Sequence, residues 1–174
     1  MELERFWTLV AAMRADSDSM ELHYRSCDKM LKKLSNQELV EFSIQISLLQ
    51  ERAYDWNLWA AAYIINGGCS DDGFVYFRTG LIFQGKEVFE AALADPESLV
   101  EIDLAPELIE YESFAYLPEY VFEEKNPDRT DFYDLTCEQL RLPEENSPRG
   151  EEWEEDDSEL KKRFPKLTEK YGLA

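Results

Sequence analysis

The sequence predicts a mostly α-helical fold: a compact single-domain helical bundle with an acidic, partly irregular C-terminal region. Apolar residues recur at spacings of three and four through residues 2–101, which is the pattern of helices with one buried face. Alternation typical of a strand never extends beyond four or five residues, and the chain has no internal repeat. With 174 residues, 44% of them hydrophobic and 13% aromatic, the chain can form one domain without a disulfide or a metal.

Two amphipathic helices are expected at the N-terminus. Residues 2–15 place a set of large apolar side chains on one side of a helix: Leu3, Phe6, Trp7, Val10 and Met13. Asp16 or Asp18 can cap the next helix. Its apolar residues are Met20, Tyr24, Cys27, Met30, Leu31 and Leu34.

The third helix has the best-defined start. Ser35 and Glu38 fit a capping box, and Leu34 and Leu39 are spaced as a hydrophobic staple. One apolar face runs through Leu39, Phe42, Ile46, Leu49 and Ala53, and a second through Val40, Ile44 and Leu48. Since both faces are apolar, this helix should lie at the centre of the bundle.

Residues 53–66 are rich in aromatic residues and alanine, which predicts a buried helix that Gly67 and Gly68 terminate in left-handed conformations. A helix with Phe74, Phe77, Leu81 and Ile82 facing inward should follow, capped by Ser70, Asp71 or Asp72. Gly85 interrupts it, and residues 86–94 form a further short helix. Asp95 and Pro96 then predict a cap and first-turn proline for one or two turns, to about Glu101.

The pattern weakens after residue 101. Pro106 can start a helix through Phe114, which Pro118 should end, and residues 119–135 are aromatic and acidic, with room for an extended piece. We therefore divide the chain into a helical domain (1–140), an acidic linker or loop (141–159) and a short basic C-terminal helix (160–174). The last carries four spaced apolar residues: Leu160, Phe164, Leu167 and Tyr171.

The chain is strongly acidic, with 38 acidic against 18 basic side chains and a formal net charge of −20. The charge is uneven: net −5 over residues 1–94, −19 over 95–159 and +4 over 160–174. Because DNA and RNA bind through contacts of Lys and Arg with phosphates, we expect no direct nucleic-acid binding. A basic protein partner is favoured electrostatically, although acidity also serves solubility alone.

Cofactors, metals and membranes are not expected. Cys27, Cys69 and Cys137 are widely spaced, and His23 is the sole histidine, so the sequence offers no zinc-ligand cluster. The N-terminal stretch has acidic residues ahead of its apolar part and no cleavage motif, unlike a signal peptide. The longest near-apolar stretch, 58–65, is far shorter than the ~20 residues that cross a bilayer. We expect a cytoplasmic protein with reduced thiols.

The candidate site is a glycine- and aspartate-rich corner between two helices, at residues 66–78. Its candidate ligand or partner residues are Trp59, Tyr63, Asn66, Asp71, Asp72 and Arg78. Paired carboxylates can bind a divalent metal or share a proton, but aspartates at a helix start also simply cap free amides. Arg78 lies about two turns beyond the aspartates and could pair with Asp71 or another carboxylate. The sequence identifies no catalytic residue and no further metal ligands.

Trp153 is a seventh candidate, for partner contact. It is the one aromatic residue in the acidic run 151–157. The indole could anchor in a pocket of a basic partner while the acids steer the encounter, or the run could be merely solvated.

Several of these motifs resemble one bacterial family of domains of unknown function. They are FW near the N-terminus, L-S-x-x-E-L-x-x-F at 34–42, AAYIINGGCSDDGFVYFRTGLIFQGK at 61–86, and FEAALADPESL at 89–99. The resemblance covers about residues 5–125. It implies a compact, mainly helical, bacterial cytoplasmic domain, found alone or with WGR-type or molybdate-metabolism-regulator-like regions. It implies no reaction and no catalytic residues.

Two hypotheses of function follow. The first is a non-enzymatic acidic interaction module, of an immunity or inhibitory type, that binds a basic partner. The alternative is a small-ligand- or metal-binding enzyme that uses the Asn66–Arg78 corner. The sequence sets neither the partner nor the oligomeric state.

Overall fold

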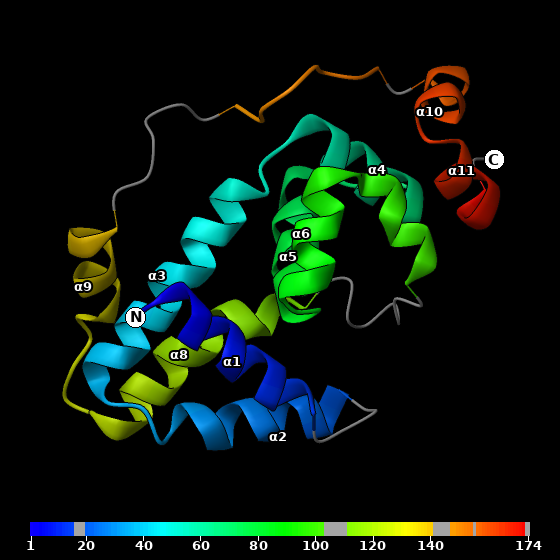
Figure 1. The fold of residues 1–174 in the computed structure, drawn as a ribbon. Helices are drawn as coiled ribbons and strands as arrows, with labels where there is room; N and C mark the ends of the chain where they lie inside the picture. Colours follow the sequence, from blue (N-terminus) through cyan, green and yellow to red (C-terminus); the bar gives the residue numbers. More distant parts are fainter. Residues whose placement is uncertain (16–19, 103–110, 141–146, 155, 173–174) are drawn as a thin grey trace.

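The polypeptide folds into a bundle of short helices (Figure 1). A computed structural model describes residues 1–15, 20–102, 111–140, 147–154 and 156–172. Within these ranges all regular secondary structure is helical apart from an isolated β-bridge between Asp55 and Arg149, which confirms the predicted fold class. The helices are α1 (Leu3–Arg14), α2 (Met20–Leu31), α3 (Asn36–Arg52), α4 (Trp56–Asn66), α5 (Asp71–Phe83), α6 (Lys86–Ala94), η1 (Pro96–Glu101), α8 (Glu112–Lys125), α9 (Phe132–Gln139), α10 (Asp157–Arg163) and α11 (Pro165–Tyr171).

α3 lies at the centre of the bundle, as its two apolar faces predict. The Ser35 hydroxyl accepts from the Glu38 amide at 3.3 Å, and the Glu38 carboxylate accepts from the Ser35 amide at 2.8 Å, so the capping box is confirmed. The helix packs against α1, α5, α8 and α9. Of the second face, Val40 is buried whereas Leu48 is 39% exposed.

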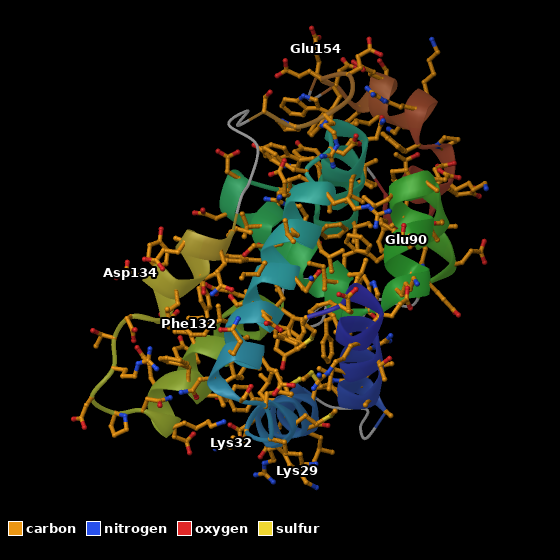
Figure 2. All side chains as sticks on the ribbon, turned by 60° about the vertical axis from the view of Figure 1, so that its left-hand side comes forward. Lys29, Lys32, Glu90, Phe132, Asp134 and Glu154 are labelled. Carbon is orange, nitrogen blue, oxygen red and sulfur yellow. The ribbon has the colours of Figure 1, made fainter. Side chains whose placement is uncertain are left out.

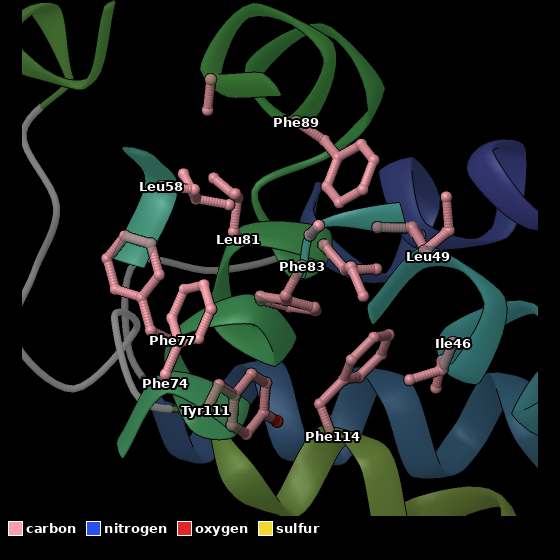
Figure 3. Packing of buried hydrophobic residues seen from close by; sticks show 14 of the residues in the cluster. Ile46, Leu49, Leu58, Phe74, Phe77, Leu81, Phe83, Phe89, Tyr111 and Phe114 are labelled. Carbon is pink, nitrogen blue, oxygen red and sulfur yellow. The ribbon is translucent and has the colours of Figure 1, made fainter. Parts of the chain in front are cut away.

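Aromatic side chains fill the core around α5 (Figure 3). Phe83 lies edge-on to Tyr111, with the ring centres 4.9 Å apart, and also contacts Phe114 of α8. Phe74 and Phe77 extend this cluster along α5. Large aromatic rings contribute much of the apolar area that folding buries, so the mutual packing of α3, α5 and α8 fixes the frame for the rest of the bundle.

α2 differs from its predicted face. Tyr24 is 43% exposed, while His23 and Cys27 are buried on the side toward the core. The His23 ring meets the edge of Phe83, and burial raises the pKa of the Cys27 thiol to about 12. The predicted caps Asp16 and Asp18 lie outside the described residues, as does the predicted helix start at Pro106.

The prediction that Pro118 ends a helix is wrong. Pro118 lies inside α8, where a proline removes one backbone hydrogen bond at a cost of about 3 kcal/mol. Phe114, Leu117, Val121 and Phe122 of the same helix are buried. Because each such side chain stabilises the fold by about 1.5–3 kcal/mol when buried, packing outweighs the local cost. The extended piece expected within 119–135 is also absent from the described residues, where α8 continues to Lys125 and α9 begins at Phe132.

Of the acidic linker or loop expected over 141–159, the structure describes residues 147–154, which form no helix and are mostly exposed, and 156–159, where α10 begins at Asp157. Residues 147–154 run across the bundle toward α10 (Figure 1). The Trp56 amide donates to the Arg149 carbonyl at 2.8 Å, and the Arg149 amide donates to the Tyr54 carbonyl at 2.9 Å. Unpaired backbone groups at the junction of α3 and α4 thus attract this segment, despite its charge.

The predicted C-terminal helix is divided into α10 and α11 at Phe164. Pro165 follows directly and disfavours helical backbone at the residue before it. Leu160, Phe164 and Leu167 are buried, and α11 packs against α4 and η1. The basic tail is therefore part of the folded body.

α11 and η1 stabilise each other's ends. One oxygen of the Glu97 carboxylate accepts from the amides of Lys166 at 2.7 Å and Leu167 at 3.3 Å, at the start of α11. In return, the Lys170 ammonium donates to the carbonyls of Val100 at 2.7 Å and Ile102 at 3.0 Å, at the end of η1. Each charge has the sign that complements the helix end it meets.

Replacing Glu97→Ala should therefore loosen α11 locally. Loss of an end cap costs about 1 kcal/mol, so backbone amides of residues 165–171 should exchange with deuterium about fivefold faster, as mass spectrometry would measure. Glu101→Ala, on the same short helix but without a hydrogen bond in the described structure, is the matched control. Equal exchange rates in the two variants would contradict the capping role.

Candidate functional site

The corner between α4 and α5 is built from a left-handed turn and a serine cap. Gly67 ends α4 with φ 67°, a conformation that favours glycine. Ser70 then caps α5, its hydroxyl accepting from the Gly73 amide at 3.2 Å. Of the three predicted caps, Ser70 is thus the one that forms the bond.

Asp71 and Asp72 occupy the first turn of α5, and both side chains are exposed. Carboxylates there stabilise the positive end of the helix dipole. Neither takes part in the ion pairs that the structure shows, and no group of three His, Cys, Asp or Glu residues in the described part of the chain could hold a metal. The structure therefore supports a role for Asp71 and Asp72 in stabilising the start of α5.

An aromatic stack supports the corner from beneath. Trp59 stacks on Trp56 at 5.3 Å and on Phe74 at 4.9 Å, with interplanar angles of 10° and 13°. The Trp59 indole donates to the Cys69 carbonyl at 3.0 Å. These contacts hold the turn against α4, and they place Trp59 in the packing of the corner.

Arg78 closes the inner side of this stack. It is only 8% exposed, and its guanidinium lies 4.7 Å from the Tyr54 ring centre and 4.8 Å from that of Phe74. It donates to the Gln50 carbonyl at 2.7 Å and to the Phe74 carbonyl at 3.3 Å. The suggested pair with Asp71 is not among the ion pairs of the described residues.

Burial lowers the pKa of Arg78, and the nearby Tyr54 and Glu51 oppose that shift. Cation–π contacts and carbonyl acceptors replace the water that the guanidinium loses. Arg78 thus joins the end of α3 to α5 and is not presented to solvent.

Tyr63 and Trp153 meet on the other side of α4. Their ring centres are 5.0 Å apart at an interplanar angle of 60°, and Trp153 is 9% exposed. Asn66 follows Tyr63 by three residues, ends α4 and is half-buried. The indole of Trp153 is therefore used for packing within this chain, and is not held out for a partner from the acidic run.

A groove that the sequence did not indicate lies elsewhere, between α3, α5, α8 and α9. Its volume is about 400 Å³, and Gln50, Val75, Tyr116, Glu119, Tyr133 and Thr136 are among the lining residues. Tyr116 is 44% and Tyr133 70% exposed. Figure 2 shows α9 alongside α3, with Asp134 on α9 pointing away from the body. Residues 119–135 are visibly aromatic and acidic, but only the packing of α9 on α3 turns them into a site.

Several carboxylates on α8 and α9, the helices that carry the groove tyrosines, have no cationic partner among the described residues, and Glu119 among them lines the groove. Glu119, Glu123, Asp134 and Glu138 belong to none of the ion pairs seen in the described structure. Burial, and then the charge of Glu123, raise the pKa of Glu119. The nearby cations are engaged: Lys125 with the backbone at the end of α2, and Arg129 with Asp131.

A comparison with protein-family models matches residues 1–124 to DUF4240, a family described as proteins of unknown function. The chain belongs to the DUF4240 family. Searches of curated proteins and of solved structures returned no match. The DUF4240 match contains the whole 66–78 corner and ends within α8, so α9 and the docked tail lie beyond it. In the described residues, no helix is both long and apolar enough to cross a membrane.

We predict that Arg78→Lys lowers the free energy of unfolding by about 2–3 kcal/mol, because lysine cannot stack between the rings or keep both hydrogen bonds. Urea denaturation would measure the change. Asp72→Asn, an exposed substitution on the same helix, should cost less than about 1 kcal/mol. Arg78→Lys as stable as the natural protein would mean that the corner does not depend on the guanidinium.

Trp153→Ala should lower the free energy of unfolding by about 3 kcal/mol, since it empties a packed site against Tyr63. Thermal and urea unfolding would measure this. The neighbouring Glu152 is exposed, so Glu152→Ala should stay within about 0.5 kcal/mol of the natural protein. If the Trp153 indole were instead exposed for a partner, Trp153→Ala would leave the free energy of unfolding unchanged.

Proposed function

We propose that this DUF4240 protein is a non-enzymatic interaction module of the bacterial cytoplasm that binds a basic protein partner, in the manner of an inhibitor or immunity protein. The observation that carries the proposal is the groove between α3, α5, α8 and α9, which exposed tyrosines and Glu119 line. Glu123, Asp134 and Glu138, on the same two helices as the tyrosines, also form none of the ion pairs of the described residues. Tyrosines supply much of the energy in protein interfaces. Complementary charge speeds the encounter and selects the partner.

The distribution of cations supports a basic partner. Arg14, Arg78, Lys125, Arg149 and Lys170 all bind backbone carbonyls within the fold. These cations are already counted in the formal net charge of −20, and residues 95–159 alone carry net −19, so a large excess of carboxylates remains. Much of the negative potential is therefore available to another molecule.

The state of the cysteines supports the cytoplasmic location. No disulfide joins Cys27, Cys69 and Cys137 in the described structure, which is typical of proteins in a reducing compartment. The alternative of an enzyme at the 66–78 corner has less support, because Arg78 is enclosed and the two aspartates lie outside on the helix end.

The proposal is tested by capture with the purified protein from a lysate of the encoding organism, at 50 mM and 300 mM salt. We expect a partner with a basic surface that is retained at low salt. After its purification, the affinity should fall at least about tenfold in a variant with Glu119, Glu123, Asp134 and Glu138 changed to Gln or Asn.

The control variant changes four exposed carboxylates elsewhere, Glu21, Glu87, Glu152 and Glu154, and so carries the same net charge. It should keep nearly the natural affinity. Failure to retain a basic partner at low salt, or equal weakening by the two variants, would contradict the proposal.

A further inference from the structure

We propose that the groove receives the side chain of a lysine, its alkyl stem on the apolar floor and its ammonium group between Tyr116, Tyr133 and Glu119. This inference rests on the proposed function and names the group that the partner inserts. It is carried by four features of the groove: its floor, its aromatic walls, its one half-buried carboxylate and the direction of its hydrogen bonds.

The floor is apolar and deep enough for a four-carbon stem. Ile46 and Phe132 are buried there, 2% and 4% exposed, and Ala115 is half-buried beside them. The volume of about 400 Å³ falls within the range of small ligand sites. Lysine commonly lays its methylene groups along such a surface while the charged end stays near water.

Aromatic rings line the walls. Tyr116 comes from α8 and Tyr133 from α9, and the ring contacts within the described residues include none between these two. Tyr116 instead contacts Tyr120, with the ring centres 6.4 Å apart. A cation within about 6 Å of a tyrosine ring centre is attracted to the ring face, so the space between the two helices suits an ammonium group.

Glu119 supplies the charge. It follows Tyr116 by three residues on α8, which places the two side chains on neighbouring positions of one helix face. The carboxylate is half-buried and makes no hydrogen bond or ion pair to the described residues. An ammonium group would compensate for the hydration that this carboxylate has lost.

Three polar side chains of the groove already use a donor within the chain. The hydroxyls of Ser47 and Thr136 donate to the carbonyls of Ser43 and Phe132, at 3.2 and 2.9 Å, and Thr136 is 8% exposed. The Gln50 amide nitrogen donates to Thr79 at 2.6 Å. The oxygens of these side chains can still accept, and no lysine or arginine lines the groove. An ammonium carries three donors and no acceptor.

Apart from the Glu119 carboxylate on α8, these acceptors are single oxygens on α3 and α9. A guanidinium gains most from two parallel carboxylate oxygens, whereas the ammonium of lysine is a compact charge with donors in three directions. The arrangement therefore fits lysine better than arginine.

The test uses a fluorescein-labelled 12-residue peptide of alternating lysine and alanine, the same peptide with acetylated lysines, and one with arginine in place of lysine. Fluorescence anisotropy at 50 mM salt measures the dissociation constant. Acetylation should weaken binding at least about tenfold, since it removes the charge. The arginine peptide should bind no more tightly than the lysine peptide.

Variants locate the site. Tyr116→Leu and Tyr133→Leu should each raise the dissociation constant about two- to fivefold, the effect of one exposed cation–π contact. Glu119→Gln should raise it about fivefold. Glu87→Gln, an exposed carboxylate on α6, is the matched control and should have little effect. Unchanged thermal unfolding would show that each variant is folded.

The possible failures of the two proposals differ. If Glu119→Gln and Glu87→Gln weaken the peptide equally, or the natural protein does not bind it, or the arginine peptide binds more tightly, the lysine site is overturned. Capture of a basic partner that depends on the four groove carboxylates would still support the interaction module. Loss of that capture overturns the module itself.

Discussion

Cationic side chains bound at helix ends link the elements that surround the aromatic core of this acidic fold. Carbonyls in the last turn of a helix have no partner within the helix, and they carry the negative end of its dipole. Here arginine and lysine side chains from distant parts of the chain bind carbonyls at or just beyond helix ends: Arg14 at Gln84, Arg78 at Gln50, Lys125 at Leu34, Arg149 at Arg52, and Lys170 at Val100 and Ile102. Each contact joins two elements of the bundle and satisfies a helix end at the same time.

These contacts leave the net charge of the protein unchanged. With 18 basic and 38 acidic side chains, the chain has a large excess of carboxylates wherever its cations bind. Of the five cations, Arg78 is buried, whereas Lys125, Arg149 and Lys170 are exposed. The described structure has nine ion pairs, most of them on exposed side chains where each contributes about 0–1 kcal/mol. The contacts at helix ends therefore join elements of the fold, while the negative potential follows from the excess of carboxylates in the composition.

Local signals in the sequence predicted the helices well, because periodicity, caps and glycine turns act over a few residues. The capping box at Ser35, the left-handed end at Gly67 and the short helix 86–94 all follow from such signals. The prediction that Pro118 ends a helix was wrong because the cost of a proline is visible in the local sequence. The burial of Phe114 and Phe122, which offsets that cost, depends on tertiary packing. The suggested pair of Arg78 with Asp71 was wrong for the same reason. Sequence spacing allowed that pair, but the Gln50 carbonyl at the end of α3 comes close to Arg78 only in the packed bundle.

The two candidate sites therefore differ in kind. The glycine–aspartate corner is conspicuous in sequence because a tight connection between two buried helices demands special residues, and the structure shows those residues stacking and capping. The groove is inconspicuous because its walls come from four helices that are distant in sequence. Its α9 wall also lies beyond the part of the chain that DUF4240 matches. The residues that match the family thus include the packed helices α3, α5 and most of α8, while part of the groove wall comes from α9. Proteins that share the frame need not share what the groove binds, because specificity follows from the residues that line a site and not from the fold that carries it.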